Sequence, residues 1–151
     1  MIDRRALVAG GAALALSACG RSKFLSYDGP EVTRIQVLKD ARRMYLLHGT
    51  DVLEEYRVHL GFQARGPKRF KGDGKTPEGA YYIDRRNPRS SFHLSLGISY
   101  PNEADRAFAA YYGRDPGGDI FIHGDRRPQD PRGRDWTAGC IAVRDRQMEQ
   151  V

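Results

Sequence analysis

The chain alternates apolar and polar residues over short stretches, which is the pattern of strands with one buried face. The clearest stretch is 52–60, where Tyr56, Val58 and Leu60 stand between charged or polar residues. Patterns of this kind, together with short apolar runs, predict strands at residues 32–38, 44–47, 52–60, 80–84, 92–99, 119–123 and 139–143.

Helical spacing is confined to two stretches. Residues 103–112 place apolar side chains on or near one face, and a terminal helix is expected from Arg146 with Asp145 as its cap. Because short strands outnumber helices, we predict a mainly β domain, a β-rich α+β fold with one or two short helices. The chain ends at Val151, about two turns into the last helix, so truncation at the C-terminus is one expectation.

The first residues have the form of an export signal. A short charged segment is followed by eleven apolar or small residues at 6–16, too few to span a bilayer, which takes about 20. The run Leu-Ser-Ala-Cys-Gly then ends the segment and resembles a lipobox, in which Cys19 becomes the lipidated first residue. The alternative is that Cys19 is an ordinary small residue at a cleavage site.

These features predict three segments. They are a lipoprotein-type signal peptide at 1–18, a tether at 19–31 and a single domain at 32–151. We therefore expect an exported protein of the periplasm or cell envelope, attached to a membrane through the lipid on Cys19. Export also disfavours a nucleic-acid partner.

The net charge of +6 fits an anionic partner, such as a membrane surface or a cell-wall polymer. Positive side chains gather in two long loops, at 66–79 with the adjoining Arg65 and at 124–138. They are Arg65, Lys68, Arg69, Lys71 and Lys75 in or beside the first, and Arg126, Arg127, Arg132 and Arg134 in the second. Such residues bind carboxylates when they flank a site, and otherwise they form an ordinary solvated surface.

Cysteine content singles out one thiol. The chain has two cysteines, and if Cys19 is acylated then Cys140 has no disulfide partner. A lone cysteine in an exported protein is a candidate reactive thiol, although a cysteine beside isoleucine is also typical of a small core residue.

A thiol nucleophile needs a base, and histidine is the usual one near neutral pH. His123 ends a predicted strand 17 positions before Cys140, which begins another, so the two side chains are expected at one sheet edge. Backbone N–H groups at Gly139 and Cys140 are candidates for an oxyanion hole. His48 precedes a glycine in the same way but belongs to a predicted hairpin turn. No His, Cys, Asp or Glu set has zinc-site spacing, so neither a metal nor a cofactor is expected.

Three ordered motifs resemble one family. The segments IFIHGD at 120–125 and RDWTAGCIAV at 134–143 resemble the active-site signature of L,D-transpeptidases, the YkuD-type catalytic domain. The matching positions are His123, Gly124, Thr137, Gly139 and Cys140. The segment GDGKTPEG at 72–79 is similar to a second family stretch, and FHLSLGISYPN at 92–102 resembles the segment before the catalytic half.

This resemblance implies a mixed β-sandwich and a cysteine–histidine mechanism on peptidoglycan stem peptides. Cys140 would attack the carbonyl at the L-centre of a meso-diaminopimelate-type residue in a tetrapeptide, and His123 would move the proton. Thr137, Gly139 and Gly124 would position these groups or the oxyanion. An amine acceptor would complete L,D-transpeptidation, whereas water would make the protein a hydrolase or L,D-carboxypeptidase. A third hypothesis is a catalytically inactive wall-binding lipoprotein.

The chain departs from the commonest signature at two positions. Ala138 stands where a histidine is common, and Ala142 stands where an arginine is common. The run Trp-Thr-x-Gly-Cys-Ile-Ala resembles a subgroup that includes peptidoglycan hydrolases. His93, Arg134 and Trp136 are the remaining candidates for the substrate pocket, with a backbone-bonded strand histidine as the alternative for His93.

Overall fold

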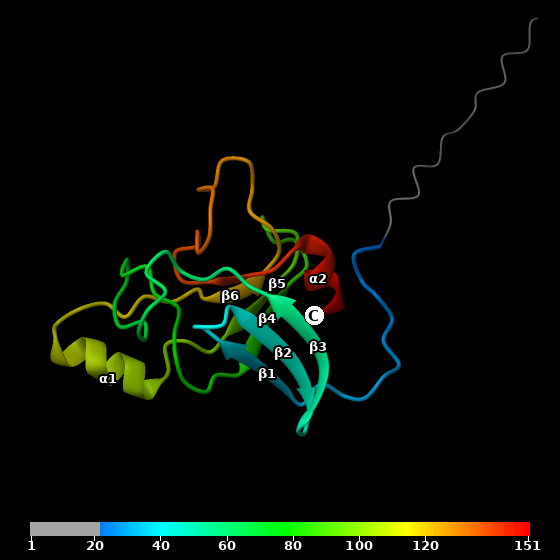
Figure 1. Ribbon diagram of the computed structural model, residues 1–151. Helices are drawn as coiled ribbons and strands as arrows, with labels where there is room; N and C mark the ends of the chain where they lie inside the picture. Colours follow the sequence, from blue (N-terminus) through cyan, green and yellow to red (C-terminus); the bar gives the residue numbers. More distant parts are fainter. Residues whose placement is uncertain (1–21) are drawn as a thin grey trace, which may run out of the picture.

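The computed structural model describes residues 22–151, and the predicted signal peptide and Cys19 lie outside the described residues. Nine elements make up the fold, in two sheets and two short helices (Figure 1). The first sheet holds β1 (Arg34–Leu38), β2 (Arg43–His48) and β3 (Asp51–Arg57). The second holds β4 (Ile83–Asn87), β5 (Ser95–Ile98), β6 (Phe121–His123) and β7 (Ile141–Ala142). The helices are α1 (Glu103–Tyr111) and α2 (Asp145–Gln150).

The two sheets differ in their connections. The first is an antiparallel meander in the order β1-β2-β3, with a tight turn at Gly49 between β2 and β3. The second follows the order β4-β5-β6-β7, and its last pair is parallel. A parallel pair needs a crossover, and here residues 124–140 supply it as a long loop that extends away from the sheets (orange in Figure 1).

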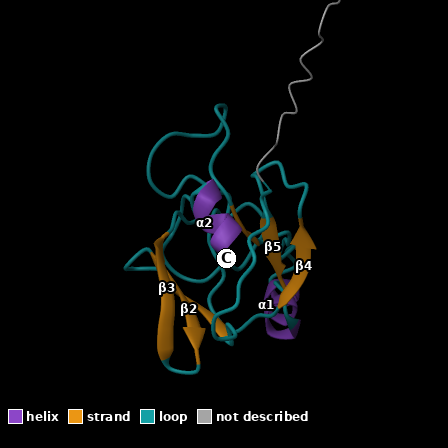
Figure 2. Cartoon of the chain, turned by 90° about the vertical axis from the view of Figure 1, so that its right-hand side faces the viewer, coloured by secondary structure: helices purple, strands orange, loops and turns teal. Residues whose placement is uncertain are grey.

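The hydrophobic core lies between the sheets. Seen from the side, β2 and β3 form one layer and β4 and β5 the other, with α2 near one end (Figure 2). The buried residues of this core are Met44, Leu46, Tyr56, Val58 and Leu60 from the first half of the chain, and Leu94, Ile122, Ile141, Val143 and Met148 from the second half. The period-two alternation of these residues is what the burial of one face of each strand requires.

The chain beyond β3 ties the two sheets together. His59 forms an antiparallel bridge with Ala142, and Gly61 forms a parallel bridge with Thr137. Between them, Leu60 accepts a hydrogen bond from the Thr137 N–H and donates its own N–H to Asp135. The segment that carries Cys140 is therefore held by the first sheet as well as by β6.

The mainly β prediction and the two-sheet architecture are confirmed, but some boundaries differ. The strand predicted at 80–84 lies at 83–87, because β4 is an edge strand with all five residues exposed and no alternation marks it. The prediction that Asp145 caps the last helix is wrong. The helix begins at Asp145, and its carboxylate accepts the Asp125 N–H from the crossover loop instead. Neither described helix is long and apolar enough to cross a membrane.

Leu60 is the side chain whose loss is expected to destabilise the fold most directly, since it is fully buried between the sheets. Leu60→Ala should lower the free energy of unfolding by about 2–5 kcal/mol in urea denaturation. Leu38→Ala is the control, because Leu38 is 42% exposed, and it should cost about 1 kcal/mol or less. Equal losses in the two variants would contradict the assignment of Leu60 to the shared core.

Candidate active site

The parallel pairing of β6 with β7 places the two predicted catalytic residues on one face of the second sheet. Ile122 pairs with Ile141, and both belong to the core. Side chains alternate along a strand, so His123 and Cys140 project from the opposite face. His123 is paired with Ala142, which offsets it from Cys140 by two residues, roughly 6.6 Å along the strand.

The Cys140 thiol makes two hydrogen bonds. Its Sγ donates to the Asp119 carbonyl at 3.6 Å and accepts the Phe121 N–H at 3.4 Å. Within residues 22–151 no hydrogen bond joins Sγ to His123. Burial raises the pKa of the Cys140 thiol, and the Phe121 N–H opposes this rise only in part. The resting cysteine is therefore a protonated thiol.

His123 is 3% exposed and its ring is fixed in orientation. Nδ1 lies 2.8 Å from the Gly124 carbonyl oxygen. A carbonyl only accepts, so Nδ1 carries the proton and Nε2 is left as the basic nitrogen. Burial lowers the pKa of the His123 imidazole, against the opposing effect of the Gly124 hydrogen bond. The ring is thus a neutral base at neutral pH.

Aromatic rings surround the imidazole. The Phe92 ring centroid lies 4.3 Å from that of His123, and the Trp136 ring lies 5.7 Å from it, near edge-on. Phe92 and Trp136 also contact each other, with centroids 5.9 Å apart. Their low polarity accounts for the burial of His123. Trp136 thus lies at the site as the sequence predicted, whereas Phe92 was not singled out.

A tight turn presents the nucleophile. The Thr137 hydroxyl donates to the Cys140 carbonyl at 2.7 Å and accepts the Gly139 N–H at 3.2 Å. Thr137 therefore shapes the turn around Cys140, and it does not bond to His123. Because the Gly139 N–H is engaged, the Cys140 N–H is the candidate oxyanion donor of this turn, and it bonds to no acceptor in the described residues.

Gly139 and Gly124 are required by close contacts. Gly139 has φ +139°, and a Cβ built there would lie 2.6 Å from the Lys75 carbonyl oxygen. A Cβ at Gly124 would lie 2.3 Å from an Asp145 carboxylate oxygen. The Gly124 N–H is already bonded to the Phe92 carbonyl at 3.0 Å, so Gly124 positions His123 through its own carbonyl.

The first basic loop is the support behind this turn. The Asp73 carboxylate accepts the N–H groups of Arg69, Phe70 and Lys75 and pairs with the Lys68 ammonium at 2.9 Å. Burial alone would raise the pKa of Asp73, but these donors outweigh it and lower the pKa to about 2. Lys68, only 4% exposed, is therefore internal. From the sequence, only the positive charge of this loop and its family-like motif could be recognised, and its supporting role could not.

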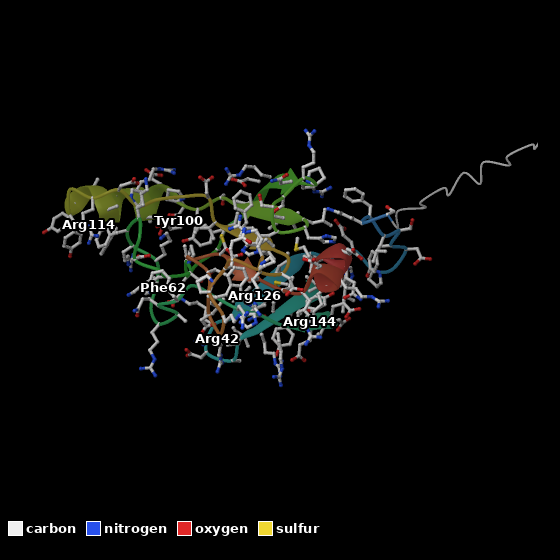
Figure 3. All side chains as sticks on the ribbon, turned by 90° about the horizontal axis from the view of Figure 1, so that it is seen from above. Arg42, Phe62, Tyr100, Arg114, Arg126 and Arg144 are labelled. Atoms are coloured by element: carbon white, nitrogen blue, oxygen red, sulfur yellow. The ribbon has the colours of Figure 1, made fainter. Side chains whose placement is uncertain are left out.

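Two other predicted pocket residues lie elsewhere. The His93 Nε2 is 2.9 Å from the Glu149 carboxylate on α2, so its ring joins the helix to the second sheet. Arg134 is exposed, next to the Asp135 carboxylate that pairs with Arg42 at 2.8 Å. In Figure 3 Arg126, in the second basic loop, lies toward the middle of the molecule, whereas Arg114 lies at its α1 end. The positive charge is thus divided between separate regions.

The described residues contain no group of three or more His, Cys, Asp or Glu arranged to hold a metal ion. What the arrangement offers is a neutral thiol and a neutral imidazole on one sheet face, with one free backbone N–H beside the sulfur. These are the groups that nucleophilic catalysis with a general base requires.

The comparisons with known proteins agree with this geometry. Residues 32–151 match the family described as YkuD, the L,D-transpeptidase catalytic domain. The chain is 34% identical over 123 residues to the Escherichia coli K12 protein named "Putative L,D-transpeptidase YafK", an alignment that covers 78% of this chain and 44% of that protein. The chain therefore belongs to the L,D-transpeptidase catalytic domain family.

Solved structures show the same fold. The helical cell shape determining protein Pgp2 from Campylobacter jejuni superposes with a TM-score of 0.59 at 27% identity, over 77% of this chain and 41% of that one. Bd1075 from Bdellovibrio bacteriovorus gives a TM-score of 0.51 at 24% identity, over 77% and 41%, and supports the fold alone. The chain spans less than half the length of these relatives.

Gly139→Ala is expected to destabilise the turn that carries the nucleophile. The positive φ and the contact with the Lys75 carbonyl should together cost at least about 3 kcal/mol in chemical denaturation. Gly133→Ala is the matched control, since Gly133 also has a positive φ (+113°) but no atom within 4 Å of the added Cβ. It should cost about 1–2 kcal/mol. Similar losses in both variants would make backbone strain, and not the close approach, the cause.

The two pKa shifts predict the pH dependence of the thiol. Since the pKa of Cys140 is raised, iodoacetamide alkylation should be slower at pH 8 than for a free thiol, and its rate should go on rising with pH beyond the point where the rate for a free thiol levels off. Mass spectrometry of the alkylated protein against time gives the rates. Rapid alkylation at pH 6 would show a preformed thiolate and would contradict the neutral resting pair.

Proposed function

We propose that this domain forms a thioester between Cys140 and a peptidoglycan stem peptide and transfers the acyl group to an amine, as an L,D-transpeptidase. One observation carries the proposal. The Gly124 carbonyl fixes the His123 tautomer, so the basic Nε2 lies on the same sheet face as the thiol. Membership of the family supplies the substrate class.

The first step is transfer of the thiol proton. Sγ–H leaves the Asp119 carbonyl and turns toward Nε2 of His123, which takes the proton as the sulfur attacks the substrate carbonyl. This exchange of partners requires a change of the Cys140 side-chain rotamer. The aromatic surroundings favour a neutral histidine before the step, which keeps the base available.

Collapse of the tetrahedral intermediate completes the acylation. The Cys140 N–H stabilises the oxyanion, and the imidazolium returns its proton to the leaving amine, a terminal D-alanine. The C–N bond breaks and the thioester remains on Cys140. An incoming amine, deprotonated by His123, then attacks the thioester and releases the thiol.

The cell-envelope setting is part of the same proposal. The lipobox-like run ending in Cys19 would hold the domain at a membrane facing the wall. The name of Pgp2 as a helical cell shape determining protein and the name "Putative L,D-transpeptidase YafK" support a role in the cell wall. Water in place of the amine gives a hydrolase or L,D-carboxypeptidase by the same acyl-enzyme.

Substitution at the nucleophile and the base tests the chemistry. Cys140→Ala should abolish the covalent adduct with a stem tetrapeptide or a carbapenem, and His123→Gln should slow its formation about 10²- to 10⁴-fold. His48→Gln is the control, because His48 also precedes a glycine but lies exposed at the β2–β3 turn, and it should leave the rate unchanged. Intact-mass spectrometry detects the adduct, and an adduct that persists on Cys140→Ala would overturn the assignment.

Incubating the wild-type protein with purified cell-wall fragments shows whether an amine or water accepts the acyl group. New cross-linked dimers would support transpeptidation, whereas release of D-alanine or of shortened peptides without dimers would identify the hydrolytic alternative.

The wild-type rate should fall as the pH drops through the pKa of His123, which burial places below its ordinary value of about 6.5. Only the unprotonated ring is a base, so activity is kept above that pKa and lost below it.

A further inference from the structure

A cavity of about 640 Å³ opens between β4 and the start of α1, and the mechanism above does not use it. Its lining includes Tyr82, Arg85, Ser99, Arg106 and Asp119. Asp119 joins the cavity to the thiol, because its backbone carbonyl accepts the Sγ–H of Cys140. Asp119 therefore belongs both to the wall of the cavity and to the contact with the thiol.

Arg85 reaches across the second sheet toward the site. Arg85 on β4 pairs with Gly97 on β5, which pairs with Phe121 on β6. Gly97 is what permits this path, since a Cβ there would lie 2.8 Å from Arg85 Nε. The guanidinium carbon sits 4.9 Å from the centroid of the Phe121 ring, and the Phe121 N–H donates to Sγ of Cys140.

The present partners of Arg85 are exchangeable. Its Nη1 lies 3.3 Å from Asp119 and its Nε lies 3.3 Å from Asp84, in pairs whose side chains are 41–83% exposed. Exposed pairs of this kind contribute little to stability. A ligand carboxylate could replace Asp119 in a two-point contact with the guanidinium, which is stronger and more specific than the pair it replaces.

The charges around Arg85 also define the other end of the ligand. When a ligand carboxylate binds the Arg85 guanidinium, the Asp119 carboxylate loses that partner and can accept hydrogen bonds from an ammonium group. Asp84, on the same rim, adds a second carboxylate. A site that offers a guanidinium next to carboxylates suits a group that bears both charges, an α-amino carboxylate.

We propose that Arg85 is the specificity-determining residue that binds the carboxylate of a free α-amino-acid end group on the acyl donor, with Asp119 and Asp84 receiving its ammonium. This rests on the proposed function, in which the attacked residue is of the diaminopimelate type and its second centre carries such a group. Ala142 is 1% exposed and uncharged, so the guanidinium that is common at that position in the family comes from β4 instead.

The first experiment compares two arginines with two donors. The donors are a stem tetrapeptide and the same peptide with the side-chain carboxylate of its diaminopimelate residue amidated. Arg85→Gln should lower kcat/KM for the free acid roughly 10- to 100-fold and leave the amidated donor unchanged. Arg86→Gln is the matched control, since Arg86 is the next residue on β4, exposed and on the opposite face, and it should change neither.

A second measurement separates this inference from the catalytic proposal. Calorimetry with the free-acid peptide on Cys140→Ala should give a Kd that rises roughly 10- to 100-fold when Arg85→Gln is added. If that rise is seen while wild-type protein forms no thioester, the proposed function fails and the Arg85 site stands. Equal losses on both donors, or an unchanged Kd, would overturn the Arg85 site. Because Arg85 is exposed, its replacement should leave the melting temperature unchanged.

Discussion

The site depends on one parallel strand pair. Because β6 and β7 run in the same direction and are very short, His123 at the end of β6 lies beside Ala142, only two residues along from Cys140, and residues 124–140 form a loop outside the sheets. The pair is only two residues long, so its direction is stabilised by other contacts. These are the bridges from His59 and Gly61 and the hydrogen bonds of Leu60.

Burial gives the site its chemical character. The aromatic rings around His123 and the packing around Cys140 shift the two pKa values away from each other, toward a neutral thiol and a neutral ring. An ion pair would react faster at rest but is costly to keep in an apolar setting. In the proposed mechanism proton transfer is therefore coupled to attack, and in the resting state the thiol donates its proton to the Asp119 carbonyl.

Much of this could be predicted from the sequence, and the failures have physical causes. Alternation located the core strands, and motif spacing brought His123, Thr137 and Cys140 into one site. The strand predicted at 80–84 lies at 83–87, because an exposed edge strand carries no hydrophobic pattern. The ion pair between Lys68 and Asp73 could not be predicted, since a lysine in a polar loop is expected to be solvated until its burial is known. Arg85 and Phe92 lie far along the chain from Cys140, and only strand register and packing bring Arg85 against Phe121 and Phe92 against His123.

The hydrogen bond between the Cys140 thiol and Asp119 also bears on the chemical lifetime of the protein. Oxidation to sulfenic and then sulfinic acid proceeds through the thiolate, and a half-buried cysteine that stays protonated reacts slowly with peroxides. In the proposed mechanism, the contact that must be broken before the sulfur attacks therefore also protects the sulfur from oxidation. Cys140 is the one cysteine within residues 22–151, so the described domain offers no second thiol that could reduce an oxidised Sγ.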